Sequence, residues 1–321
     1  ALAALATVGA AQAQSSVTVY GSMDLSYDSV KFENISGNTG TAGQAKVSGI
    51  NATDNAAAGA LTSSRIGFRG TEDLGGGLRA GFNLEYGIFG NLTGDSANTT
   101  TAATTNAASN ATPNTTGATL QTRTSRLSLE SSKLGTVNVG YGLTGLFDTV
   151  SGHSPLPGNN FYGDVAYSSD GSATGRARSS ADNRILAGAV RMSGINYITP
   201  SFNGFRARVD FGAGRQDWSD ARTDNAVVSN LGLTVNYAQG PVALAATVHQ
   251  TKSDQSTSLT SATAGPAVNN VVTKTDYQAF SARYAVTGNL SVNALYAKNE
   301  SRELDLIVGK SDVQQVGIKY D

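Results

Sequence analysis

The 321-residue sequence contains no cysteine and only two histidines, and its charge is nearly balanced, with 23 Lys and Arg against 24 Asp and Glu. The absence of cysteine excludes disulfide frameworks, cysteine-based zinc sites and thiol nucleophiles. Two histidines leave little room for a histidine-based metal cluster, so we expect no metal site and no cofactor. The near-zero net charge argues against a nucleic-acid-binding protein, which normally carries a basic excess.

A long hydrophobic run is also missing. After residue 13 no stretch approaches the roughly 20 apolar residues of a membrane-spanning helix. The apolar stretch ALAALATVG at residues 1–9 is followed by Ala11-Gln12-Ala13, which fits the end of a signal peptide and its A-x-A cleavage site. We therefore expect residues 1–13 to be a signal-peptide remnant and residues 14–321 to form the exported protein.

Alternation of apolar and polar residues is the dominant pattern. In residues 78–86, for example, the apolar side chains Leu78, Ala80, Phe82, Leu84 and Tyr86 alternate with Arg79, Gly81, Asn83 and Glu85. The same period of two returns in about 12 segments between residue 17 and residue 320, and no stretch shows helical periodicity. The pattern predicts an all-β protein whose strands each have one apolar face.

Short and long connections alternate along the chain. The short ones carry turn residues, as at 72–77, 203–204, 239–241 and 288–289. The long ones are polar and lie at about 31–60, 89–119, 143–188, 212–226, 251–274 and 299–310. This sorting is typical of a transmembrane antiparallel β-barrel with short turns on one rim and long loops on the other. A soluble β-sandwich is the weaker alternative, because nothing in it sorts loops by length.

Several of these segments resemble one known family. The run SSRIGFRGTEDLGGGLRAGFNLEYGIFG at residues 63–90 resembles the second and third strands of Gram-negative general porins, especially the β-proteobacterial branch. QSSVTVYGSMDLSY at residues 14–27 is similar to their first strand. RTSRLSLESSKLGTVNVGYG at residues 123–142 and NYITPSFNGFRARVDFG at residues 196–212 look like later strands.

The resemblance implies a fold, a location and partners. Such porins are homotrimers of 16-stranded barrels in the bacterial outer membrane, surrounded by its lipid, and they pass small hydrophilic solutes and ions. This chain shows only about 12 strand segments and stops at Asp321, where the family closes on a terminal aromatic residue. Because an open sheet edge cannot lie in lipid, we expect the barrel to be incomplete at the C-terminus.

The resemblance also predicts where the pore narrows. In the family the third long loop folds into the barrel, and the matching segment here is about 143–188, with Asp148, Asp164, Asp170 and Asp182. Strand parity places four arginines and two glutamates on the facing wall, namely Arg65, Arg69, Arg79, Arg126, Glu85 and Glu130. The family has further pore arginines near Arg123 and Arg191, but parity puts Arg123 on the face of Leu127, so its pore role requires a local twist.

We therefore expect a water-filled channel that prefers anions, because four arginines outnumber two glutamates on the wall and the loop charges nearly balance. The arginines could instead only pair with neighbouring carboxylates to hold the wall. A surface β-protein acting as an adhesin or structural module is the alternative function. An enzyme is not expected, because His153 lacks the G-x-S-x-G elbow that would accompany a hydrolase triad.

Overall fold

The computed structural model of the chain describes residues 16–23, 26–36, 42–51, 64–89, 119–152, 191–216, 226–255, 271–303 and 305–320. These residues form one helix and fourteen strands. The strands are β1 (Ser16–Ser22), β2 (Ser26–Ser36), β3 (Ala42–Asn51), β4 (Arg65–Gly75), β5 (Leu78–Phe89), β6 (Thr119–Ser131), β7 (Gly135–Leu143), β8 (Arg191–Ile198), β9 (Phe205–Gln216), β10 (Ala226–Gln239), β11 (Val242–Gln255), β12 (Val271–Ala285), β13 (Leu290–Glu303) and β14 (Leu306–Tyr320). The helix is α1 (Gly145–Gly152), between β7 and β8.

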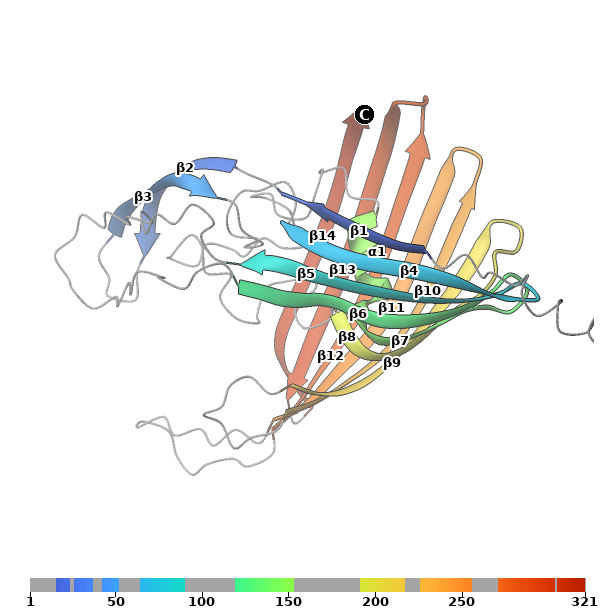
Figure 1. Ribbon diagram of the computed structural model, residues 1–321. Helices are drawn as coiled ribbons and strands as arrows, with labels where there is room; N and C mark the ends of the chain where they lie inside the picture. Colours follow the sequence, from blue (N-terminus) through green and yellow to red (C-terminus); the bar gives the residue numbers. More distant parts are fainter. Residues whose placement is uncertain are drawn as a thin grey trace, which may run out of the picture.

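Twelve of the strands make one antiparallel sheet in the order β1-β4-β5-β6-β7-β8-β9-β10-β11-β12-β13-β14, and β2 and β3 make a separate hairpin. The sheet curves on itself, so that its first strands pass in front of its last strands, with α1 on the enclosed side (Figure 1). In the described part of the chain, β1 and β14 each pair on one side only. The predicted all-β antiparallel architecture is confirmed.

The two faces of the sheet differ as the alternation predicts. On the outward face, large apolar side chains stay exposed, among them Val139, Phe211, Leu231, Val248 and Phe280. The inward face carries mainly polar or small residues, for example Asn138, Thr247 and Asn293. A sheet that exposes its apolar face and turns its polar face inward has the reverse polarity of a soluble protein and suits a lipid surrounding.

A row of three glycines crosses the inward face where the sheet bends. Gly140 of β7 lies opposite Gly194 of β8, and Gly194 lies opposite Gly212 of β9. A Cβ added at Gly140 would collide with the carbonyl oxygen of Ser125, and one at Gly194 would collide with that of Phe211. Only glycine permits so close an approach of neighbouring backbones, and such positions mark tight bends of a barrel wall.

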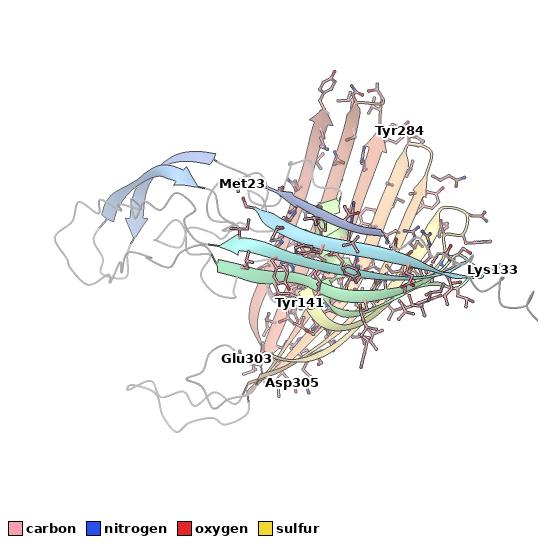
Figure 2. The ribbon with its side chains drawn as sticks, viewed as in Figure 1. Met23, Lys133, Tyr141, Tyr284, Glu303 and Asp305 are labelled. Carbon is pink, nitrogen blue, oxygen red and sulfur yellow. The ribbon has the colours of Figure 1, made fainter. Side chains whose placement is uncertain are left out.

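Four of the predicted long connections, 31–60, 212–226, 251–274 and 299–310, contain more strand than expected, and the first and last differ most. Within 31–60 the structure has part of β2 and all of β3, and 299–310 reduces to a turn at Asp305, because β13 runs to Glu303 and β14 starts at Leu306. Glu303 and Asp305 lie together at this turn (Figure 2). Both faces of the strand are polar over 299–303, so alternation could not reveal it.

The absence of helix was also a wrong prediction, since residues 145–152 form α1. Its eight residues are too few to give a clear helical period, and a helix this short depends on tertiary packing. A bilayer-crossing helix needs about 20 residues, so no helix in the described ranges could cross a membrane. The signal-peptide remnant lies outside the described residues, and the expected incompleteness at the C-terminus gains no support from the structure.

Candidate functional site

Most of the predicted site residues lie together on the inward face of β4, β5 and β6, which we call the arginine face (Arg65, Arg69, Arg79, Glu85, Arg123, Arg126 and Glu130). Arg69 is opposite Asn83, which is opposite Arg126 on the next strand. Arg79 is opposite Glu130. The cross-strand register thus brings four arginines from three strands onto one surface, as parity predicted.

Arg123 reaches this surface through a β-bulge. Glu85 pairs with Thr124 and Tyr86 pairs with Thr122, so Arg123 is the extra residue that no partner on β5 opposes. A bulge re-aims the side chain of its extra residue. The Arg123 Nε donates a hydrogen bond of 2.9 Å to Glu85 Oε1, and the local twist that Arg123 required is therefore present.

Glu85 is the centre of a small charge cluster. Besides Arg123, the Nε of Arg65 lies 3.8 Å from Glu85 Oε2, and the Tyr20 hydroxyl lies 3.0 Å from the same oxygen. The side chains of Arg65, Arg123 and Glu85 are 30%, 16% and 17% exposed. Two arginines thus share the Glu85 carboxylate. Arg191, at the start of β8, donates from Nε to the Arg123 carbonyl oxygen at 2.9 Å.

The remaining arginines have no carboxylate within ion-pair distance among the described residues. Arg69 and Arg79 are exposed, and Arg126 is partly exposed. The Arg69 guanidinium carbon lies 5.3 Å from the ring centroid of Tyr20, within cation–π range. Arg69 and Arg126 line a hollow of about 220 Å³ on the inward face, together with Thr18, Asn83 and Asn138. Glu130 also lines this hollow, which is open to solvent and holds two arginines against one carboxylate.

Asp148 lies elsewhere. It is on α1, and its Oδ2 accepts a 2.7 Å hydrogen bond from Arg208 of β9. Partial loss of hydration raises the pKa of the Asp148 carboxyl above its ordinary value, although Arg208 and the more distant Arg126 act in the opposite direction. Asp164 and Asp170, like Asp182, lie outside the described residues. The structure therefore brings eight of the twelve candidate residues together, namely the arginine face and Arg191, and leaves Asp148 with a different partner.

Tyr20, Arg208 and Asp210 are polar residues of the inward face that sequence reasoning did not single out. Each could have been found from parity. Tyr20 falls between the apolar residues of its strand, and Arg208 and Asp210 alternate with Val209 and Phe211. What parity could not supply is the partner of each charge, because partners come from other strands and from α1.

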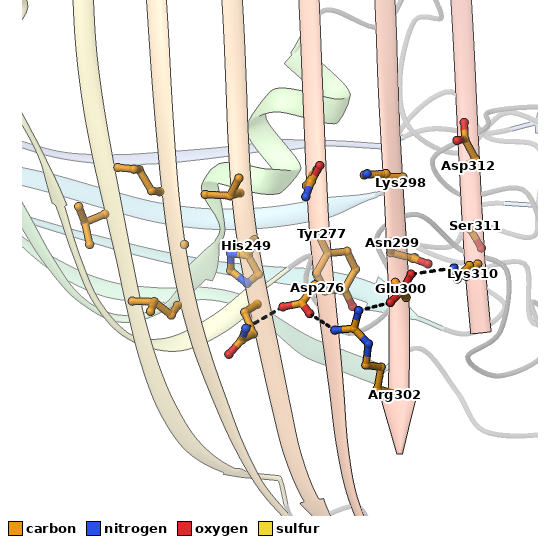
Figure 3. Close-up of a pocket in the computed structure, with 17 residues that line it drawn as sticks. His249, Asp276, Tyr277, Lys298, Asn299, Glu300, Arg302, Lys310, Ser311 and Asp312 are labelled. Carbon is orange, nitrogen blue, oxygen red and sulfur yellow. Dashed lines mark hydrogen bonds and ion pairs between the residues drawn. The ribbon is translucent and has the colours of Figure 1, made fainter. Parts of the chain in front are cut away.

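A second hollow, of about 870 Å³, lies on the outward face of β9–β14 (Figure 3). Its wall on β9–β11 is mainly apolar, and charged side chains of β12–β14 pair with each other. Arg302 lies 3.2 Å from Asp276 Oδ2, and the Lys310 Nζ lies 3.0 Å from Glu300 Oε2. These ion pairs join β12, β13 and β14 near the turn at Asp305, beyond the apolar part of the strands, and tie these strands together at one rim.

Comparison with known proteins gives consistent matches. The family model described as Gram-negative porin matches residues 1–321. Outer membrane porin protein 32 of Delftia acidovorans is 32% identical over 252 residues, which cover 78% of this chain and 59% of the relative. An outer membrane porin protein of Bordetella pertussis is 42% identical over 101 residues, covering 28% of this chain and 23% of the relative. The chain thus spans less than two thirds of either relative.

Among solved structures, the anion-selective porin from Comamonas acidovorans is 18% identical with a TM-score of 0.37, covering 95% of this chain and 97% of that one. The Salmonella typhi OmpF complex with daunomycin is 13% identical with a TM-score of 0.44, covering 95% of this chain and 86% of that one. TM-scores this low establish nothing beyond the sequence matches.

Proposed function

The chain belongs to the Gram-negative porin family, and we propose that it forms a water-filled channel in the bacterial outer membrane for passive diffusion of small hydrophilic solutes and ions. The observation that carries this proposal is the polarity of the sheet, which exposes apolar side chains outward and gathers polar and charged ones inward. Such a wall closed into a barrel would face lipid on one side and water on the other. The protein conducts solutes and is not an enzyme.

The channel prefers anions. The arginine face and the neighbouring Arg191 supply six arginines, namely Arg65, Arg69, Arg79, Arg123, Arg126 and Arg191, against the two carboxylates Glu85 and Glu130. An excess of positive charge on a low-dielectric wall raises the local concentration of anions. Arg69, Arg79 and Arg126 contribute most, because no carboxylate lies within ion-pair distance of them in the described part of the chain.

The segment 143–188 narrows this channel. Support comes from its first part, because α1 lies on the enclosed side of the sheet and contacts β9, β10, β11 and β12. Asp164 and Asp170, later in the same segment, are the acidic groups that we propose for the constriction, and both lie outside the described residues. The barrel closes with the strand number of the family, and three copies associate through their outward faces, surrounded by outer-membrane lipid.

The test is single-channel recording of the purified protein in a planar bilayer, with the zero-current potential measured across a KCl gradient. Discrete conductance steps and a potential of the sign given by chloride preference are expected. If no conductance steps are seen, the proposed channel function is wrong and the alternative of a surface-binding protein is favoured. Steps with potassium preference would leave the channel standing and overturn the assignment of the arginine face.

A further inference from the structure

The N-terminus of α1 is fitted into the wall of the sheet. Thr144 caps the helix by accepting a 3.2 Å hydrogen bond on its Oγ1 from the Phe147 amide. The Gly145 amide donates to Asp210 Oδ2 at 2.8 Å, which places a carboxylate at the positive end of the helix. A Cβ at Gly145 would collide with Thr234 Oγ1, so a glycine is required for this approach.

Arg208 joins the helix to the wall. Its Nε donates to Asp210 at 2.8 Å, one terminal nitrogen donates to Asp148 at 2.7 Å, and the other donates to the Leu143 carbonyl oxygen at 2.5 Å. Arg208 is only 7% exposed and Asp210 is fully buried. A buried guanidinium needs such partners, and its planar fork can hold two carboxylates at once.

The other side of α1 covers an apolar part of the inward face. Leu146 and Val150 are almost completely buried and pack in one cluster with Tyr277, Ala279, Leu295 and Ala297 of β12 and β13. The small side chains of the two alanines leave room for the helix. Thr149 and Thr247 add a contact between helix and wall, with their hydroxyl oxygens 2.6 Å apart. This part of the inward face is dry because the helix lies on it.

We propose that Arg208 and Asp210 are the positioning residues that hold α1 on the wall formed by β9–β13, which we call the docked face, and so confine the aqueous path to the arginine face. Without the helix, Ala279 and its apolar neighbours would line water. The consequence for solute passage rests on the proposed channel function, whereas the docking itself does not.

Because the chain has no cysteine, a single introduced thiol reports accessibility without interference. Ala279→Cys, beneath α1, is compared in otherwise wild-type protein and with Asp210→Asn, using a charged, membrane-impermeant thiol reagent and mass spectrometry. We expect slow labelling in the first and labelling faster by at least about tenfold in the second, since local opening sets the rate. Ser128→Cys, on the inward face of β6, is the control and should label rapidly in both backgrounds.

A second arrangement separates docking from general damage to the fold. Thr149→Cys and Thr247→Cys place two thiols where the hydroxyls now touch, close enough for an engineered cross-link. These two substitutions are combined with Arg208→Met and Ala279→Cys in one protein. The thiol reagent is then applied to two samples, one with the cysteines at 149 and 247 oxidised to a disulfide and one with them reduced. We expect the oxidised protein to regain slow labelling at residue 279.

Equal protection of Ala279→Cys with and without Asp210→Asn, in protein that keeps its β circular dichroism, would overturn the proposal. So would rapid labelling in the parent or in the oxidised form. Labelling does not depend on conductance, so a protein that labels as expected but forms no channel would contradict the proposed function and leave the docking intact.

Discussion

The arginine face and the docked face both carry arginines and carboxylates at inward parity, but the charges are exposed on the first and buried on the second. On the arginine face, Arg69 and Arg79 are exposed and arginines outnumber carboxylates. On the docked face, Arg208 is 7% exposed and bonds to two carboxylates and a carbonyl oxygen. Strand parity determines which face of the sheet a side chain occupies. Whether α1 lies on that part of the face determines whether the charge is exposed to a passing ion.

The comparison has an energetic side. A solvent-exposed ion pair contributes about 0–1 kcal/mol to the free energy of unfolding. A buried pair loses about 3–5 kcal/mol when one partner is removed, because the other charge is left without compensation. The arginine face should therefore tolerate substitution and change conduction, whereas the docked face should not tolerate it.

The largest expected effect is at Arg208. Arg208→Met leaves the buried Asp210 without its guanidinium, and we expect the free energy of unfolding to fall by about 3–5 kcal/mol. Arg69→Met, the matched change on the arginine face, should cost less than about 1 kcal/mol. Urea unfolding of the detergent-solubilised proteins, followed by circular dichroism, measures both. Equal losses would remove the distinction between the two faces.

The second largest effect is expected from a charge placed on the apolar side of β5, and it tests whether the arginine face is the side that contacts water. Phe82 and Asn83 are neighbours on β5 with opposite parity. Phe82→Arg places a charge on the apolar face and should cost roughly 2–4 kcal/mol near the bilayer midplane. Asn83→Arg should assemble normally and alter conductance. The yield of heat-modifiable, folded protein in membranes compares the two, and equal tolerance would contradict the assigned parity.

A smaller effect is expected at the contact between α1 and the wall. Gly145→Ala forces a Cβ against Thr234 and should destabilise the protein by about 1–3 kcal/mol, the usual cost of overpacking. Gly152→Ala is the control in the same helix, because nothing lies within 4 Å of a Cβ there. Thermal unfolding midpoints of the two variants should differ clearly. If both match the parent, the helix does not sit tightly on the docked face.

Charge reversal on the arginine face should change the free energy of unfolding least and the ion selectivity most. Arg69→Glu combined with Arg126→Glu turns two positive charges that line the inward hollow into negative ones while the fold remains. We expect the zero-current potential in a KCl gradient to change sign, because fixed charges at a constriction set selectivity. Arg206→Glu, an exposed position on β9, serves as the control for a charge change away from the arginine face. An unchanged potential in the double variant would show that these arginines do not line the path.

The sequence predicted the strands and their faces well, because a period of two is strong wherever one face is apolar. It missed β3, inside the predicted connection 31–60, and the strand ends at 299–303, where both faces are polar. It predicted no helix at 145–152, because α1 is short and is stabilised by packing on β9–β13.

The candidate site was predictable in part for the same reason. Arg65, Arg69, Arg79 and Arg126 follow from parity alone. Arg123 does not, since a single bulge opposite Glu85 and Tyr86 reverses its side, and a bulge depends on the pairing of two strands. The pairing of Asp148 with Arg208 joins residues 60 positions apart, so only the folded structure reveals that this carboxylate faces the docked wall.

The glycine row at Gly140, Gly194 and Gly212 leaves bare backbone at one level across β7, β8 and β9. A Cβ at any of the three positions would meet a carbonyl oxygen of a neighbouring strand at 2.9 Å or less. A larger residue there would therefore push two strands apart rather than move one side chain. We expect these three positions to accept no residue other than glycine, whereas exposed positions such as Arg69 and Arg79 can vary without moving the backbone.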